Sequence, residues 1–96
     1  MSHVTADSFT ACYSVATESE PGVLPRLLGH LAKIGVVPTR VHATTADDEL
    51  HVDLQVTGID ANRAALLEQR FATTVGVLWV AYSSKGVADG SSGFWL

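Results

Sequence analysis

The stretch PTRVHATTADDELHVDLQVT, residues 38–57, decides the fold of this chain of 96 residues. Apolar and polar side chains alternate through its second half, residues 50–57, which is the period of a β-strand with one buried face. The apolar members are Leu50, Val52, Leu54 and Val56. The polar sequence ADDE at residues 46–49 has the length and composition of a hairpin connection. We therefore predict that residues 38–45 form a second strand, antiparallel to residues 50–57.

A symmetric hairpin loop fixes which residues of the two strands lie opposite each other. It pairs Val41 with Leu54 on the apolar face and His42 with Asp53 on the polar face. The polar face also carries Arg40, Thr44, His51 and Gln55. A carboxylate beside an imidazole is found in general bases and, with a second imidazole, in zinc sites. Because the spacing of a metal motif is missing, we expect His42 and Asp53 to form a solvated cross-strand pair.

An amphipathic helix is predicted before the hairpin, over residues 21–34. Its apolar side chains recur at spacings of three and four and form one stripe: Leu24, Leu27, Leu28, Leu31 and Ile34. Pro21 suits the first turn of this helix, and Gly35 can end it. Ser19 or Glu20 lies near its N-cap.

A second helix is predicted after the hairpin, over residues 61–73. Gly58 ends the preceding strand, Asp60 can cap the helix, and Gly76 closes the connection that follows it. The apolar side chains of this helix are Ala64, Leu66, Leu67 and Phe71.

Two further strands are predicted at the ends of the folded region. Residues 9–16 carry their larger side chains at alternate positions, and residues 77–82 are rich in β-branched and aromatic side chains. Trp79 has the opposite parity to its two neighbours, so we expect it on the open face of a sheet or at an edge. There it is either a binding residue or is covered by the terminal sequence Phe94-Trp95-Leu96.

The element order predicts an α+β fold, a ferredoxin-like βαββαβ sandwich. Its four-stranded antiparallel sheet has the spatial order 4-1-3-2, with two helices on one face. We expect the folded domain to cover residues 9–83, with an N-terminal extension at residues 1–8 and a flexible tail rich in Gly and Ser at residues 84–96. The strand at residues 38–45 is then a free edge, and two such edges can pair about a two-fold axis into one continuous sheet.

The composition excludes several classes of function. The net charge is −4 and the six Lys and Arg residues are scattered along the sequence, which argues against a nucleic-acid partner. Cys12 is the single cysteine, so we expect no disulfide, no metal site and no cofactor. No apolar stretch approaches the roughly 20 residues of a membrane span, and we expect a cytoplasmic protein with no membrane partner.

Two segments resemble the ACT domain family. The sequence ESEPGVLPRLLGHLAKIG, residues 18–35, is similar to the first loop and helix of ACT domains, and LLEQRFATTVGVLWV, residues 66–80, is similar to their second helix and last strand. Within the family, the Gly-x-Leu-x-Arg segment looks most like the small regulatory subunit of acetolactate synthase. That segment is formed here by Gly22, Leu24 and Arg26.

The resemblance implies a homodimeric regulatory domain without catalytic residues, which binds a small amino acid between protomers and modulates a larger catalytic subunit. Carried over by position, the effector site is formed by Ser19, Glu20, Pro21, Gly22, Val23 and Leu24 of one protomer and Val37, Pro38 and Thr39 of the other. Ser19 stands where amino-acid-binding members often have Asn or Asp, and Val37 stands where the synthase subunits often have Asn. These two departures leave an alternative, a dimeric assembly module without ligand sensing.

Overall fold

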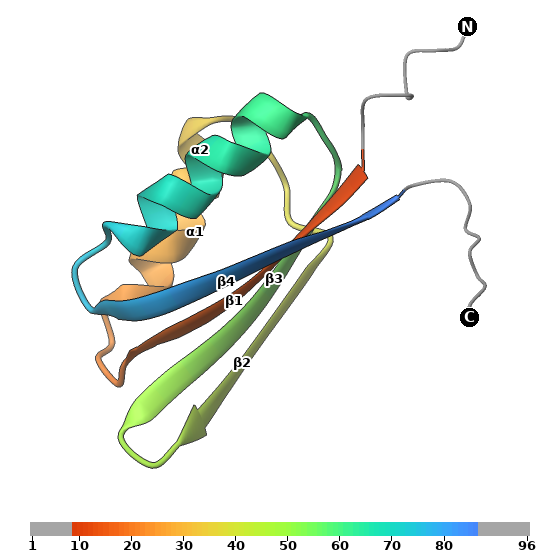
Figure 1. Cartoon of the computed structure of the whole chain (residues 1–96). Coiled ribbons are helices and arrows are strands. Elements are labelled where there is room, and N and C mark those ends of the chain that lie inside the picture. Colours follow the sequence, from red (N-terminus) through yellow and green to blue (C-terminus); the bar gives the residue numbers. More distant parts are fainter. Residues whose placement is uncertain (1–8, 87–96) are drawn as a thin grey trace, which may run out of the picture.

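Six elements follow one another along residues 9–86, the part of the chain that the computed structural model describes (Figure 1). They are β1 (Phe9–Glu18), α1 (Val23–Lys33), β2 (Arg40–Ala46), β3 (Glu49–Ile59), α2 (Ala61–Ala72) and β4 (Val77–Gly86). The predicted order of strands and helices is confirmed. The predicted extension at residues 1–8, most of the predicted tail and the terminal Phe94-Trp95-Leu96 lie outside the described residues.

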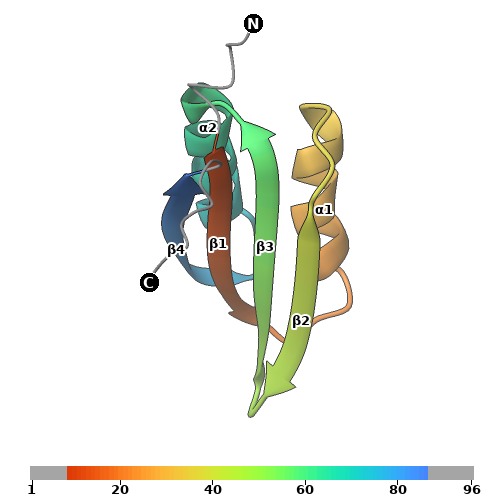
Figure 2. The same cartoon turned by 90° about the vertical axis from the view of Figure 1, so that its right-hand side faces the viewer.

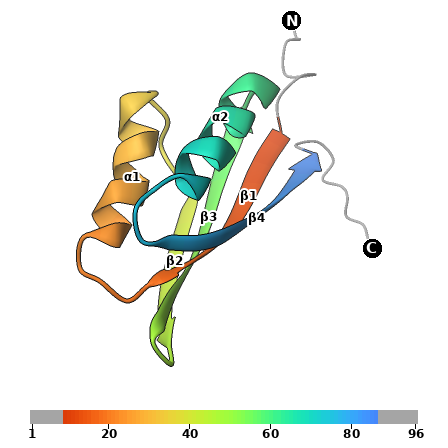
Figure 3. The same ribbon diagram turned by 60° about the vertical axis from the view of Figure 1, so that its left-hand side comes forward.

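The four strands form one antiparallel sheet in the order β2-β3-β1-β4, which is the predicted order 4-1-3-2 written from the other edge. Both helices cover the same face of the sheet, with α1 on the β2 side and α2 on the β4 side (Figures 2 and 3). The predicted hairpin register is confirmed, because Val41 pairs with Leu54 and His42 pairs with Asp53. The fold is therefore the ferredoxin-like sandwich predicted from the alternation of residues 50–57.

The core lies between the sheet and the two helices. Tyr13 of β1 is at its centre, where its ring meets the ring of Phe71 edge to face at 5.1 Å and its hydroxyl donates a hydrogen bond of 2.7 Å to the carbonyl oxygen of Ala64. Burial raises the pKa of Tyr13 well above its usual range. The other buried apolar side chains include Ala11, Val15, Val23, Leu27, Leu31, Val52, Leu54, Val56, Ile59 and Leu67. Most of them come from the stripes and alternations predicted above.

The ends of several elements differ from the predictions. Helix α1 begins at Val23 rather than at residue 21, and Gly22 occupies its N-cap without a side-chain cap, so neither Ser19 nor Glu20 caps it. Strand β3 continues through Gly58, which adopts a φ of +80°, and ends at Ile59. The predicted cap of α2 is confirmed, because Asp60 accepts a hydrogen bond of 2.8 Å from the backbone N–H of Arg63.

The strand β4 is longer than predicted because it pairs with β1 from Val77 to Gly86, with Leu78 alone left out by a register shift. Its last residue, Gly86, lies opposite Phe9, so the ladder extends past residue 82 into the sequence Ser83-Ser84-Lys85. The first residues of the predicted tail are therefore part of the sheet.

The face of the sheet opposite the helices has no covering layer among residues 9–86 (Figure 2). Trp79 lies on this face, opposite Ala16 and edge to face with His51 at a ring distance of 6.4 Å, and 51% of its surface is exposed. Between Ala16 and Thr17 the pairing with β4 shifts by one residue, so that Thr17 lies opposite Val77. The position predicted for Trp79 is thus confirmed.

Neither described helix is long and apolar enough to cross a membrane.

Candidate functional site

The two segments of the predicted effector site lie at opposite ends of α1. The loop at residues 19–22 follows Glu18, which pairs with Glu49, and Glu49 also pairs with Ala46 at the end of β2. This loop therefore lies at the hairpin end of the sheet. Residues 37–39 follow α1 at its other end and lead into the start of β2 (Figure 3). A single chain does not bring the two segments together.

The side chains of the first segment differ in their exposure. Ser19, Glu20 and Pro21 are exposed, and Gly22 and Leu24 are partly buried. Val23 has no exposed surface and belongs to the core, so only its backbone is near the loop. Gly22 has a helical conformation, with φ −81° and ψ −11°, which does not require glycine.

Backbone amides at the start of α1 provide hydrogen-bond donors. The amide of Val23 donates to Glu20 and that of Arg26 donates to Gly22, both at 3.3 Å. Within the described residues, the amides of Gly22 and Leu24 have no acceptor. Free amides at a helix N-terminus favour a carboxylate, because the helix dipole places its positive end there.

The second segment is fixed to β3 by hydrogen bonds. The amide of Thr39 donates to the carbonyl oxygen of Gln55 at 2.7 Å, and its hydroxyl oxygen accepts from the amide of Thr57 at 2.9 Å. The hydroxyl proton of Thr39 has no acceptor among the described residues. Val37 beside it is 81% exposed, and Pro38 is partly buried.

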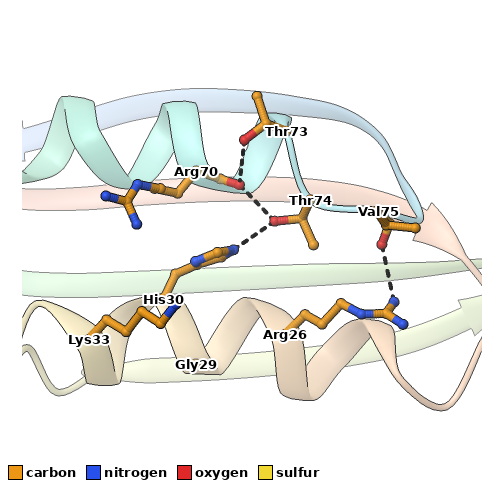
Figure 4. Close-up of a pocket in the computed structure, with 8 residues that line it drawn as sticks. All are labelled: Arg26, Gly29, His30, Lys33, Arg70, Thr73, Thr74 and Val75. Carbon is orange, nitrogen blue, oxygen red and sulfur yellow. Dashed lines mark hydrogen bonds between the residues drawn. The ribbon is translucent and has the colours of Figure 1, made fainter.

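A pocket of about 380 Å³ opens between α1 and α2 (Figure 4). Eight residues of the two helices and of the turn between α2 and β4 line this inter-helix pocket: Arg26, Gly29, His30, Lys33, Arg70, Thr73, Thr74 and Val75. None of them belongs to the predicted effector site.

A chain of hydrogen bonds fixes the centre of the inter-helix pocket. The hydroxyl of Thr74 donates to the carbonyl oxygen of Arg70 at 2.7 Å, so its oxygen accepts from Nε2 of His30 at 2.8 Å. His30 therefore carries its proton on Nε2, and its buried Nδ1 has no partner among the described residues. Burial lowers the pKa of His30, and the positive charges of Arg70 and Lys33 lower it further.

Arg26 closes one end of the inter-helix pocket. Its Nη1 donates to the carbonyl oxygen of Val75 at 3.2 Å, and its guanidinium lies over Gly22, where an added Cβ would be 3.1 Å from Nη2. Arg26 thus connects the first turn of α1 to the turn that leads into β4.

The inter-helix pocket was not predicted from the sequence, although the sequence contains part of its pattern. Arg26, His30 and Lys33 are spaced by four and three residues, which places them on one side of a helix. Arg70 and Thr74 come from the other helix and its turn, and only the tertiary structure brings them to the same place.

The open face of the sheet carries a smaller hollow of about 200 Å³ beside Arg40 and Gln55. Asp53 in this hollow accepts a hydrogen bond of 2.9 Å from the hydroxyl of Ser14. His42 lies opposite Asp53, but its Nδ1 is within 3.5 Å of the hydroxyl of Thr44. Among residues 9–86, no group of three or more His, Cys, Asp or Glu side chains could hold a metal ion.

A family model described as an ACT-like domain matches residues 4–87. The chain belongs to the ACT-like domain family. The matched range contains all six elements of the sandwich and both predicted effector segments. No curated protein matches this ACT-like domain in sequence.

Solved structures of ACT domains share the fold. The ACT domain from the GTP pyrophosphokinase of Chlorobium tepidum has a TM-score of 0.69 at 16% identity, over 79% of this chain and 99% of that one. An ACT domain protein from Streptococcus pneumoniae has a TM-score of 0.66 at 16% identity, over 92% and 99%. The regulatory subunit of aspartate kinase from Thermus thermophilus has a TM-score of 0.63 at 13% identity, over 91% and 62%. At such identities the likeness concerns the fold.

The resemblance predicted from the two sequence segments is therefore confirmed for the ACT-like family. The ACT-like domains are a regulatory family, and this chain consists of one such domain over most of its length. None of these comparisons points specifically to the small subunit of acetolactate synthase.

Proposed function

We propose that this ACT-like domain acts as a cytoplasmic homodimer that binds a small amino acid between its protomers and modulates an amino-acid-biosynthetic enzyme of the acetolactate synthase type. It is a regulatory protein and not an enzyme. The larger catalytic subunit is its partner, and no cofactor takes part.

The single observation that carries the proposal is the free edge of β2. Among residues 9–86 this strand pairs with β3 only, and all seven of its residues are exposed. An unpaired edge presents a row of N–H and C=O groups, which a second strand can pair with. Val41 on this edge is 39% exposed and would be covered by a neighbouring protomer.

The geometry of such a pairing supports the predicted effector site. A two-fold axis at the edge sets two copies of β2 antiparallel, so the start of one copy lies beside the end of the other. The loop at residues 19–22 lies at the hairpin end of the sheet, where β2 ends. Residues 37–39 of the second protomer would then approach this loop and its free amides. A carboxylate at the amides of Gly22 and Leu24, with the hydroxyl of Thr39 nearby, is the arrangement that we propose.

Sedimentation velocity tests the dimer. We expect the full chain to sediment as a dimer and the variant Ala43→Lys to sediment as a monomer, because residue 43 is central in β2 and like charges would face each other across the axis. The matched control is Ser84→Lys on β4, the other edge strand of the sheet, which should remain dimeric. A wild-type monomer at every concentration, or loss of the dimer in the control alone, would exclude the β2 interface.

Calorimetry with branched-chain amino acids, serine, glycine and aromatic amino acids tests the effector site. We expect one ligand to bind to the wild type and to bind more weakly to Thr39→Val. If none binds while the dimer is intact, the alternative function as an assembly module without ligand sensing is favoured. Co-purification of a catalytic subunit from native lysate tests the regulatory role in either case.

A further inference from the structure

The positive charges of this acidic domain are concentrated in the inter-helix pocket. The chain has ten Asp and Glu residues but only six Lys and Arg residues. Three of these six, Arg26, Lys33 and Arg70, line the pocket together with His30. None of the eight lining residues is acidic. The formal charge of the residues that line the pocket is therefore opposite in sign to the net charge of the domain.

These cations are not used in ion pairs within the described residues. The ion pairs found there join His51 to Glu49 and Arg63 to Asp60. The side chains of Lys33 and Arg70 donate no hydrogen bond to any described residue, and Arg26 uses Nη1 for the carbonyl oxygen of Val75. Most of the N–H groups of the pocket are thus available to a ligand.

Helix dipoles explain only part of this arrangement. Lys33 and Arg70 lie in the last turns of α1 and α2, where positive charge is stabilising. Arg26 lies in the first half of α1, where the dipole does not favour a cation, and it nevertheless lines the same pocket. The dipoles also do not account for the cavity that separates the side chains (Figure 4).

We propose that the inter-helix pocket is a second ligand site, separate from the edge of β2, and that it binds a small organic molecule through a phosphate group. Guanidinium groups match the geometry of phosphate oxygens, and a dianion offsets the charges of several cations at once. The volume of about 380 Å³ exceeds that of a phosphate ion and is at the lower end of the roughly 300–1,000 Å³ found for small-molecule sites. It has room for a phosphate and a small organic body.

Gly29 offers a way to block the pocket without disturbing the core. It lies in α1 and lines the pocket, and a Cβ added there has no atom of another described residue within 4 Å, apart from its chain neighbours and the backbone of α1 itself. A leucine at this position would extend into the pocket, and it is also a better helix former than glycine. Gly29→Leu should therefore prevent binding while the fold is retained.

Titration of the ¹⁵N-labelled full chain, followed by NMR at constant ionic strength, tests the proposal. The probes are inorganic phosphate, ribose 5-phosphate and AMP, with ribose and malonate as comparisons. We expect saturable shifts at the amides of residues 29–33 and 70–75, with tighter binding of a phosphate ester than of inorganic phosphate. Ribose should cause no shift, and malonate should bind more weakly.

The variants make the outcome specific. Arg70→Gln and Lys33→Gln should each weaken binding by about tenfold or more, because each removes a charged hydrogen-bond donor. Arg40→Gln removes the same charge from β2 and should bind like the wild type. Gly29→Leu should not bind, while its thermal unfolding is unchanged or shifted upward.

Three results would overturn the proposal. They are the absence of saturable shifts with every phosphate, equal weakening in Arg40→Gln and Arg70→Gln, and stronger binding of malonate than of any phosphate. The dimer and amino-acid experiments use other residues, so their failure would leave this result unaffected, and the reverse is also true.

Discussion

The substitution Gly76→Ala tests how the turn between α2 and β4 is fitted to the core. Gly76 has a φ of +98°, and a Cβ added there would lie 2.7 Å from Cγ2 of Val23. Val23 is fully buried, and its β-branched side chain has few alternative rotamers. The carbonyl oxygen of Gly76 also accepts a hydrogen bond of 2.8 Å from the amide of Glu18, which fixes the backbone. The turn can therefore neither move away nor rotate easily.

The expected loss of stability has two parts. A non-glycine residue in a left-handed conformation costs about 1–2 kcal/mol. Overpacking a filled core costs about 1–3 kcal/mol more. We therefore expect Gly76→Ala to lower the free energy of unfolding by about 2–5 kcal/mol. In a domain of this size, each 1 kcal/mol lowers the unfolding temperature by about 4–8 °C.

Urea and thermal unfolding followed by circular dichroism would measure this loss, with Gly58→Ala as the control. Gly58 also has a positive φ, +80°, but a Cβ added there would have no atom within 4 Å from any other described residue beyond its two chain neighbours. It should lose only the conformational part, about 1–2 kcal/mol. The double variant Val23→Ala with Gly76→Ala should lose less free energy of unfolding than the two single variants lose together. The reason is that alanine at residue 23 lacks the Cγ2 atom that the added Cβ of residue 76 would contact. Equal losses in the two glycine variants, or strict additivity in the double variant, would refute this account.

Two further predictions concern Tyr13 and His30. Tyr13→Phe removes the hydroxyl that donates to Ala64, and it should lower the free energy of unfolding by about 0.5–1.5 kcal/mol in urea titrations, whereas Tyr82→Phe should have a smaller effect. The folded state holds the pKa of His30 below its usual value because of burial and the nearby Arg70 and Lys33, so the unfolded chain binds a proton first as the pH falls. The contribution of His30 to the free energy of unfolding should then be fully present above about pH 6.5. It should decrease below that pH and level off below the folded pKa of His30. In urea titrations at several pH values, the variant His30→Gln should lack this contribution to the decrease.

The register of the hairpin was predictable from the sequence, because alternation along one strand and the length of one loop determine it. The ends of strands were less predictable, since they depend on a partner far away in the sequence. Ser84 and Lys85 have no strong preference for strands, yet they belong to β4 because β1 lies beside them. Gly58 was expected to end β3, but its positive φ is accommodated within the strand.

The two candidate sites were predictable to different degrees, because local sequence patterns can be recognised whereas contacts between distant segments cannot. The effector segments follow from the resemblance to ACT domains, and they meet only if two protomers pair. The inter-helix pocket depends on the contact between α1 and α2, which no local pattern specifies. Three of its eight lining residues, Arg26, His30 and Lys33, nevertheless have a spacing that places them on one side of a helix.

The helical period explains how α1 can serve the core and both proposed sites. With about 3.6 residues per turn, Val23, Leu27 and Leu31 form the central line that faces the sheet. Leu24 and Leu28 lie on one side of this line and are partly buried. Arg26 and Lys33, the cations that α1 contributes to the inter-helix pocket, lie on the other side. Figure 2 shows α1 over the β2 side of the sheet and α2 over the β4 side. Because the pocket side of α1 lies opposite Leu24 and Leu28, a substitution such as Lys33→Gln alters the proposed anion site without removing a side chain that packs against the core.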